Sequence, residues 1–402
     1  MSTQETERSS PGLRPGRPLR DKATWITYFQ LSCFAWFMYG FGASQALLRD
    51  DQGTTRAVSA LHSTSLATAG IISGLITSRF IERWGRGMVL RLGSVGTIAG
   101  VLIYTLPEAP YPVTMLGAFV TSFFGTIMLI TVNAFLIDHQ GPAGSAAITE
   151  GNALASMAGL IAPLAIGIGA ATFLGWRWGL ICAALGLVVV ELVRGRSVAL
   201  YNDAHHAPTV MAEGRMPASF AWNTVIVMCF LGAEFSFILW GADLLRERAQ
   251  FGPAAAAASV AAVTGGMAIG RVVGARLAQT LPNDRILKWS VVIALVGFAL
   301  AWVTASGIPI LIGMFVTGVG LGVQWPLGVA RAVATSGGRT DRASALTSVF
   351  GSCSIALAPF ALGALADATD FHLALLLVPA MLIVALVLLI AKPVTSPPAP
   401  AR

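Results

Sequence analysis

Residues 371–391 have the sequence FHLALLLVPAMLIVALVLLIA, an apolar run without a single Asp, Glu, Lys or Arg. A helix needs about 20 mostly apolar residues to cross the roughly 30 Å core of a bilayer, so this run predicts a transmembrane helix. Of the 402 residues in the chain, 55% are hydrophobic and 11% are charged, whereas a soluble domain is about a quarter charged. The composition therefore excludes an ordinary cytosolic enzyme, a disordered tail and a nucleic-acid module, and it predicts a polytopic membrane protein.

Apolar runs of similar length recur along the chain and predict an all-α membrane protein with twelve transmembrane helices. Most of the loops between them are short. We expect the helices at residues 25–48, 57–80, 88–106, 113–137, 147–173, 176–193, 219–242, 254–280, 288–306, 309–333, 344–367 and 371–391.

One polar stretch, residues 194–217, interrupts this series between the sixth and seventh spans. It predicts a cytoplasmic linker between two six-helix bundles, residues 23–193 and 218–392. Residues 1–22 are polar and rich in Pro, Arg and Ser, and they lack the short apolar stretch and cleavage site of a signal peptide. We therefore expect a disordered cytoplasmic leader, and a cytoplasmic tail at residues 393–402.

The basic residues predict the orientation of the chain. Its 26 Lys and Arg residues exceed its 19 Asp and Glu residues, for a formal charge of +7. Basic residues that flank spans are retained in the cytoplasm. With the N-terminus inside, all of them fall on the cytoplasmic side except Arg49, Arg56, Arg177, Arg246 and Arg248. The excess of base therefore indicates topology and not a nucleic-acid partner. It places both termini in the cytoplasm, and we expect the bacterial plasma membrane.

An internal duplication is visible at an offset of 196 residues. GAFVT at 117–121 recurs as GMFVT at 313–317, and APLAIG at 162–167 recurs as APFALG at 358–363. Because each half contains an even number of spans, the two halves have the same orientation and are related by a pseudo-twofold axis along the membrane normal. Two such bundles leave a central cleft that can open to either side, which is the physical basis of alternating access.

The segment between the second and third spans, residues 78–87, has the sequence SRFIERWGRG. It is similar to the signature loop of the major facilitator superfamily, Gly-x-x-x-Asp-Arg-x-Gly-Arg-Lys/Arg, with Ser78 in place of the first Gly and Glu82 in place of Asp. GWRW at 175–178 and GMAIGR at 266–271 also resemble this superfamily, and the resemblance covers all twelve spans. The passage from Asn133 through Gly141-Pro142 to Asn152 and Pro163 looks most like the fucose-permease-like branch.

The resemblance implies a cytoplasmic gate at this loop. Arg83 and Arg86 can bind carboxylates and helix C-terminal carbonyls, and Glu82 can lie against the positive N-terminus of a neighbouring helix that begins near Ser344. Such contacts would hold the halves together and break when the cleft opens inward. The alternative is that these charges anchor the loop at the lipid headgroups. Arg271 and Arg331 lie near cytoplasmic helix ends, where snorkelling is the ordinary explanation, and they are further gate candidates.

Glu234 is the one acid placed deep in a predicted span. It lies nine residues before Asp243, roughly 13 Å below that end of the seventh helix. An ionisable group at this depth usually faces a bundle interior or a wet cavity, and a carboxyl that gains and loses a proton there would couple transport to the proton gradient. The alternative is a structural hydrogen bond. Fucose-permease-like symporters carry acids in helices 1 and 4, where the nearest positions here are Gln45 and Leu129, so Glu234 would have to replace them.

In the resembled superfamily the cleft is lined by helices 1, 4, 7 and 10, so polar and aromatic residues of these helices are the candidate solute contacts. Interhelical packing or hydrogen bonding is the alternative for each of them. The segment Gln324-Trp325-Pro326 is the most specific candidate for a solute contact. Pro326 removes a backbone hydrogen-bond donor and favours a kink that exposes carbonyl groups. The solute-binding candidates are Tyr39, Gln45, Asn133, Glu234, Ser236, Trp240, Gln324 and Trp325.

These features favour a secondary active transporter that moves a small organic solute by alternating access and is coupled to protons. A drug-type efflux antiporter or a uniporter of the same fold is the alternative, and a membrane sensor or an integral-membrane enzyme is the alternative from another class. No nucleophile elbow, Walker loop, His-Glu-x-x-His or metal-ligand cluster is present in the sequence. We expect no enzymatic activity, cofactor, metal or nucleic-acid partner, and a monomer in the lipid bilayer.

Overall fold

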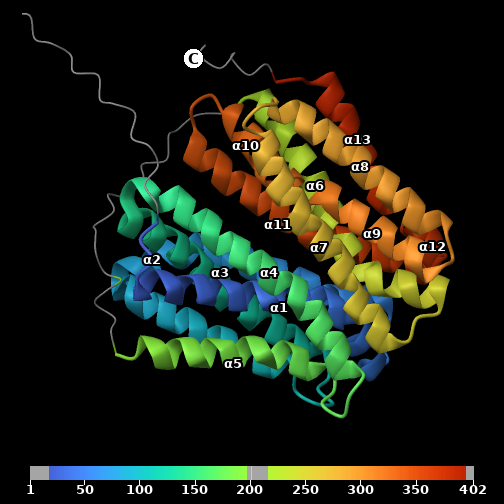
Figure 1. Cartoon of the computed structure of the whole chain (residues 1–402), viewed down its shortest axis with the longest axis horizontal. Coiled ribbons are helices and arrows are strands. Elements are labelled where there is room, and N and C mark those ends of the chain that lie inside the picture. Colours follow the sequence, from blue (N-terminus) through green and yellow to red (C-terminus); the bar gives the residue numbers. More distant parts are fainter. Residues whose placement is uncertain (1–17, 197–200, 202–215, 395–402) are drawn as a thin grey trace, which may run out of the picture.

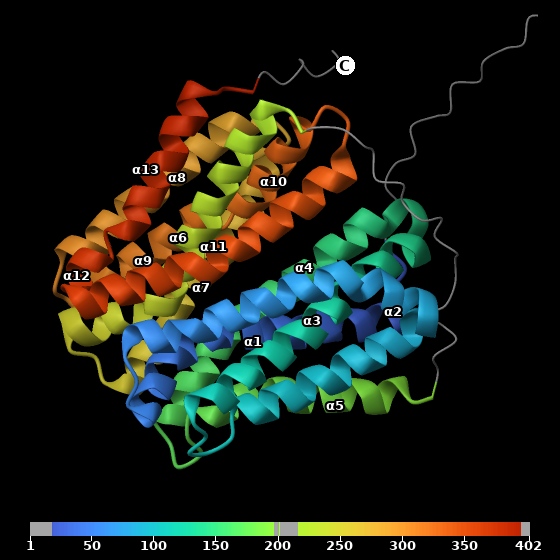
Figure 2. The same cartoon turned by 180° about the vertical axis from the view of Figure 1, so that it is seen from behind.

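A computed structural model describes residues 18–196, 201 and 216–394, and all of its regular elements are helices (Figures 1 and 2). Most of the predicted leader and tail, residues 1–17 and 395–402, lies outside the described residues. So does most of the predicted linker, at residues 197–200 and 202–215.

The first half of the chain forms five α-helices and one short 3-10 helix. Asp21 caps the first helix by accepting a hydrogen bond from the Thr24 backbone N–H at 2.8 Å. Gly53, in the left-handed region, terminates this helix. The elements are α1 (Lys22–Gln52), α2 (Arg56–Tyr104), α3 (Tyr111–Gln140), η1 (Gly141–Ala143), α4 (Gly144–Ala170) and α5 (Arg177–Arg194).

Helix α2 contains both the second and the third predicted spans, where the sequence predicts a separating loop. The two spans meet at Gly85, whose φ of 72° and ψ of 157° interrupt the helical geometry within α2. This φ is readily adopted only by glycine, so Gly85 of the signature segment supplies the kink that reverses the chain.

The second half forms the remaining helices. The predicted tenth span is divided between α9 and α10 at Gly322–Val323, just before Gln324-Trp325-Pro326, as expected for a proline-associated kink. The elements are α6 (Ala218–Ala249), α7 (Pro253–Leu277), α8 (Asn283–Val303), α9 (Gly307–Leu321), α10 (Gln324–Ala334), α11 (Thr340–Ala368), α12 (Phe371–Ala374) and α13 (Leu377–Ala391).

Within the described ranges, nine helical segments are long and apolar enough to cross a membrane. One of them, α2, comprises two of the predicted spans. The more polar α1 and the short α5 supply the other two. The prediction of an all-α protein with twelve spans is therefore confirmed.

The helices form two groups, α1–α5 and α6–α13, whose most extensive contacts are between α2 and α11, between α4 and α7, and between α1 and both α6 and α7. Figure 2 shows the two groups meeting near the start of α2 and diverging towards the opposite end of the molecule. We refer to these as the Asp50 end, where α1 ends and α2 begins, and the Gly85 end, where α2 is kinked.

The duplicated sequence corresponds to duplicated packing. A Cβ at Gly117 of α3 would lie 2.3 Å from the Tyr104 backbone nitrogen in α2, and a Cβ at Gly313 of α9 would lie 2.5 Å from the Ala301 nitrogen in α8. Real Cβ contacts are not this short, so both helix pairs require glycine for their close approach. A similar close contact therefore occurs in both halves, with the contacted residue of α8 one position beyond the 196-residue offset.

Replacing Gly117 with Val is expected to lower the free energy of unfolding by about 1–3 kcal/mol, the usual cost of overpacking. The added carbons meet the backbone of α2 and force α2 and α3 apart. Thermal unfolding in detergent measures the effect. Gly74→Val is the matched control, because a Cβ at Gly74 has no atom of the described structure within 4 Å. Equal melting temperatures for the two variants would contradict the prediction.

Candidate functional site

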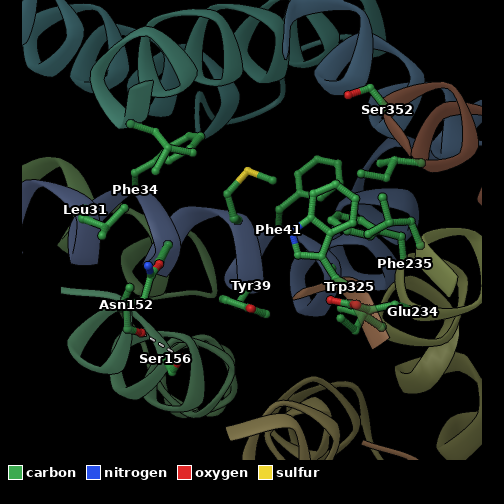
Figure 3. A pocket seen from close by; sticks show the side chains of 18 of the residues that line it. Leu31, Phe34, Tyr39, Phe41, Asn152, Ser156, Glu234, Phe235, Trp325 and Ser352 are labelled. Atoms are coloured by element: carbon green, nitrogen blue, oxygen red, sulfur yellow. Dashed lines mark hydrogen bonds between the residues drawn. The ribbon is translucent and has the colours of Figure 1, made fainter. Parts of the chain in front are cut away.

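A cavity of about 380 Å³ lies between the two groups of helices (Figure 3). Its walls are mainly apolar and aromatic, with a small number of polar groups, which is typical of a small-molecule site. Helices α1, α3 and α4 of the first half and α6, α7, α10 and α11 of the second contribute to it. The polar and aromatic residues that line it are Phe34, Tyr39, Phe41, Asn152, Ser156, Glu234, Phe235, Arg271, Trp325, Ser348 and Ser352.

Glu234 lies in α6 and lines the cavity with a 6% exposed side chain. No described residue donates a hydrogen bond to its carboxyl or forms a salt bridge with it. Burial of a carboxylate that accepts no hydrogen bond is costly, because only the charge of Arg271 in the same cavity offsets its lost hydration. The site therefore contains an acid that is available to a proton or to a positively charged group.

Arg271 lies in α7 and is the basic residue of the same cavity, where its charge attracts that of Glu234. Its guanidinium donates hydrogen bonds to the Tyr39 hydroxyl at 2.9 Å, to the Ser156 hydroxyl at 3.3 Å and to the Gly322 carbonyl at 3.3 Å. Tyr39 and Ser156 belong to the first half and Gly322 to the second, so Arg271 joins the two halves at the cavity.

Three of the eight predicted solute contacts line the cavity: Tyr39, Glu234 and Trp325. Leu129, at the position of an acid in the resembled branch, also lines it. Figure 3 shows Tyr39, Glu234 and Trp325 among the side chains around this space. The structure therefore brings together residues from α1, α6 and α10.

Gln45 and Trp240 are placed elsewhere by their hydrogen bonds. The Gln45 amide donates to the Tyr104 hydroxyl at 2.6 Å and accepts from Ser59 at 3.1 Å, so it joins α1 to α2. The Trp240 indole donates to the Pro359 carbonyl at 3.2 Å, which joins α6 to α11.

Asn133, Ser236 and Gln324 are not among the residues that line the cavity. Ser236 is fully buried and Gln324 is 1% exposed. Some of their polar side-chain atoms have no hydrogen-bond partner in the part of the chain that is described. These atoms are the Ser236 hydroxyl, both polar atoms of the Gln324 side-chain amide and the side-chain amide oxygen of Asn133. Trp36 of α1 donates its indole N–H to the Gly179 carbonyl of α5 at 2.6 Å.

Besides Arg271, four polar residues of the cavity lie outside the helices from which solute contacts were predicted. Asn152 and Ser156 are on α4, the fifth span, and Ser348 and Ser352 are on α11, the eleventh. Each pair is spaced four residues apart, which places both members on one face of a helix. This spacing of polar residues within an apolar span is the sequence pattern that could have identified them as cavity residues.

At the Asp50 end the two halves are joined by ion pairs. Arg49 of α1 forms a bidentate pair with Asp243 of α6, and Asp50 of α1 pairs with Arg246 of α6 at 2.7 Å. The first pair is largely buried, with side chains 11% and 3% exposed. Arg49 and Asp50 therefore make reciprocal contacts with an acid and a base on the same helix.

Two further acids of the second half contact the start of α2. Arg56 pairs with Glu247. The Asp367 carboxylate accepts hydrogen bonds from the backbone N–H groups of Arg56 at 3.1 Å and Ala57 at 2.8 Å. A carboxylate is favoured at a helix N-terminus by the helix dipole. We call the contacts of Arg49, Asp50 and Arg56 with the second half the Asp50-end network.

The predicted gate residues lie at the Gly85 end, apart from Arg271. Glu82 and Arg83 are exposed. Arg86 is 6% exposed and pairs at 2.6 Å with Asp138 of α3, in its own half.

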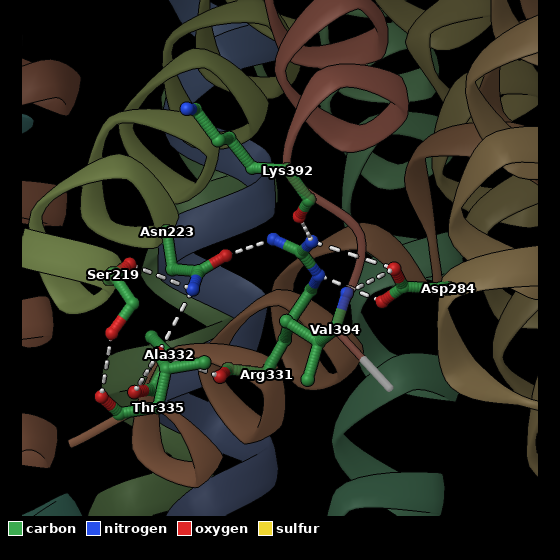
Figure 4. A network of polar contacts seen from close by, with 8 residues as sticks. All are labelled: Ser219, Asn223, Asp284, Arg331, Ala332, Thr335, Lys392 and Val394. Atoms are coloured by element: carbon green, nitrogen blue, oxygen red, sulfur yellow. Dashed lines mark hydrogen bonds and ion pairs between the residues drawn. The ribbon is translucent and has the colours of Figure 1, made fainter. Parts of the chain in front are cut away.

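Arg331 is buried and connects elements of the second half (Figure 4). Its guanidinium donates to Asp284 of α8 at 2.7 Å, to the Lys392 carbonyl at 2.5 Å and to the Asn223 side chain of α6. These contacts tie α10 to three other segments of the same bundle.

The sequence profile of the Major Facilitator Superfamily matches residues 25–290 and 224–402. The chain belongs to the Major Facilitator Superfamily. It is a multi-pass membrane transporter of small solutes and not an enzyme.

Solved structures of other transporters share the superfamily fold. The nucleoside transporter NupG has a TM-score of 0.70 and 12% identity, with coverage of 92% of this chain and 98% of NupG. A bacterial homolog of the human lysosomal transporter Spinster, solved inward-facing and unoccupied, has a TM-score of 0.71 and 12% identity, with coverage of 93% and 97%. The peptide transporter POT in complex with sulfate has a TM-score of 0.73 and 13% identity, with coverage of 94% and 95%. No curated protein matches the chain in sequence.

Proposed function

We propose that this superfamily member is a secondary active transporter that moves a small organic solute by alternating access and couples its movement to protons through Glu234. The supporting observation is a buried carboxyl that lines the cavity between the halves and accepts no hydrogen bond from the described residues. A carboxyl in such a place can exchange a proton with whichever side the cavity faces.

The orientation follows from the positive-inside rule, which assigns the Asp50 end to the outside and both termini to the cytoplasm of a bacterial cell. The Asp50-end network then closes the cavity to the outside. In the opposite state we propose that Glu82, Arg83 and Arg86 hold the Gly85 end closed. We therefore propose that this is the inward-facing member of the alternating pair.

The solute-binding residues that we propose are those that line the cavity: Tyr39, Asn152, Ser156, Glu234, Arg271 and Trp325. We assign Gln45 and Trp240 to interhelical hydrogen bonding instead, because their polar atoms are used there. The fucose-permease-like branch remains our proposal, based on the passage from Asn133 to Pro163.

Solute uptake in proteoliposomes, with and without an imposed proton gradient, tests the function once a solute library has supplied a substrate. Glu234→Gln is expected to abolish accumulation above equilibrium, whereas slower downhill equilibration persists at saturating solute. An amide keeps the shape of the carboxyl but cannot cycle a proton. Ser236→Ala is the matched control, because Ser236 is buried on the same helix and does not line the cavity.

Each outcome distinguishes a function. Unchanged gradient-driven accumulation in Glu234→Gln would remove Glu234 from the coupling mechanism. Equilibration without accumulation by the native protein would identify a uniporter. Solute efflux driven by an inward proton gradient would identify an antiporter.

A further inference from the structure

A second cavity, of about 230 Å³, lies beside the first and between the two halves. Its walls come from α2, α3 and α11. Ser348 and Ser352 of α11 line both cavities, so the second adjoins the solute site along this helix. The other lining residues are apolar or glycine: Gly70, Ile71, Gly74, Leu75, Ile130, Ala345 and Val349. We call this second cavity the side chamber.

Gly70 and Gly74 keep the α2 wall of the side chamber open. A Cβ at Gly74 would have no described atom within 4 Å, and a Cβ at Gly70 would meet only the Ser122 and Thr126 hydroxyls of α3 at 3.8 Å. Nearer the Asp50 end, α2 and α11 do touch, because the Thr64 hydroxyl donates to the Ala356 carbonyl at 2.9 Å. The chamber is therefore closed towards that end and has room opposite the glycines.

The charge of the main cavity indicates which chemical group its ligand carries. Arg271 already donates three hydrogen bonds to protein oxygens, whereas the Glu234 carboxyl accepts none from the described residues. Trp325 and Phe235 are aromatic residues that line the same cavity. An acid beside aromatic rings recognises an organic ammonium through a charge-assisted hydrogen bond and cation–π attraction.

We propose that the transported solute is an amphipathic amine whose ammonium group binds Glu234 and whose apolar arm extends past Ser352 into the side chamber. This inference rests on the proposed transport function. The buried acid fixes the polar end, and the apolar walls on α2 and α11 remove the arm from water. Affinity then depends on two separable contacts, that of the ammonium group with Glu234 and that of the apolar arm with the side chamber.

Binding of n-alkylamines from butylamine to dodecylamine tests this proposal, with the purified full chain in lipid nanodiscs and empty nanodiscs subtracted. Affinity is expected to rise about fourfold for each methylene that enters the side chamber, until the chamber is full. Gly74→Leu places a side chain in the chamber and is expected to remove this dependence on chain length, with butylamine affinity unchanged. Gly74→Ala is the matched control, because it replaces the same glycine and leaves most of the space.

Glu234→Gln is expected to weaken all the amines at least tenfold and to leave the increment per methylene intact. Val349→Phe fills the chamber from α11 and provides a second test if Gly74→Leu does not fold. The same chain-length dependence in a folded chamber-filling variant as in the native protein would overturn the proposal. So would a failure of every amine to bind; proton-driven accumulation of a different solute would then leave the transport function standing.

Discussion

Replacing Asp243 with Asn is expected to open the cavity at the Asp50 end. Asp243 is 2% exposed and accepts two hydrogen bonds from Arg49. Breaking a buried ion pair by removing one partner costs about 3–5 kcal/mol, because the remaining charge is left buried and uncompensated. Since the pair joins α1 of one half to α6 of the other, this cost falls on the state in which the Asp50 end is closed. The equilibrium should move towards the open state by about a hundredfold or more.

Cysteine labelling measures this shift. Ile238 lines the cavity and lies one helical turn nearer the Asp50 end than Glu234. In a background without the four native cysteines, Ile238→Cys should react with a membrane-impermeant maleimide, added from the Asp50 side, at least tenfold faster when Asp243→Asn is present. An unchanged labelling rate would show that the pair does not hold this end closed.

Asp51 supplies the matched control for the gate. It pairs with Arg177 at 2.9 Å and accepts a hydrogen bond from the Trp176 indole at 2.9 Å, all within the first half. Asp51→Asn removes a similar charge at the same end without touching the contact between halves, so labelling should stay slow. In the double variant Arg49→Ala/Asp243→Ala, Ile238→Cys should be labelled more slowly than in Arg49→Ala or Asp243→Ala alone. The double variant leaves no lone buried charge.

The fold was largely predictable because its determinants are local. Apolar runs such as residues 371–391 predict spans without any knowledge of their neighbours, and the repeat of GAFVT as GMFVT predicts that the halves share a plan. The structure differs at Gly85, where the charged, glycine-containing segment predicts a loop but α2 continues through a single non-helical residue. The sequence pattern predicts that the chain turns at this polar segment. Whether the turn is a loop or a kinked helix depends on the dihedral angles of Gly85.

The site was only partly predictable, because a helix's rotation about its axis depends on its neighbours. Glu234 could be found as the one deep acid. Gln45 could not be separated from Tyr39 on the same helix, since its hydrogen bonds to Tyr104 and Ser59 become visible only when α2 is packed against α1. The serines of α11 were missed for the same reason.

The Asp50-end network shows the same limit more clearly. When each helix is considered alone, its charged residues resemble ordinary charges at a helix end. These residues are Arg49 and Asp50 in α1, and Asp243 and Arg246 in α6. Their reciprocal pairing requires the ends of α1 and α6 to lie side by side. The positive-inside count places Arg49 and Arg246 on one side of the membrane but does not pair them. Long-range contacts of this kind depend on how the halves dock, which local patterns do not determine.

Replacing Arg271 with Gln is expected to slow solute exchange about a hundredfold or more. The guanidinium holds Tyr39 and Ser156 of one half and Gly322 of the other, and hydrogen bonds to charged groups contribute about 1.5–3 kcal/mol each. Its loss also leaves Glu234 as the lone charge lining the described cavity. Arg271→Lys keeps the charge but not the planar fork of donors, so its rate should be intermediate.

Counterflow of the solute identified by the library screen, measured in proteoliposomes at saturating concentration, gives the rates. Tyr39→Phe removes one of the three hydrogen bonds and should cost about tenfold. The double variant Arg271→Gln/Glu234→Gln should be faster than Arg271→Gln alone, because it removes the uncompensated carboxylate together with its partner. If the rate losses of the two single substitutions instead multiply in the double variant, the substitutions act independently, and Arg271 does not act through the charge of Glu234. If Arg271→Gln exchanges at the native rate, the contacts of Arg271 with both halves are structural only.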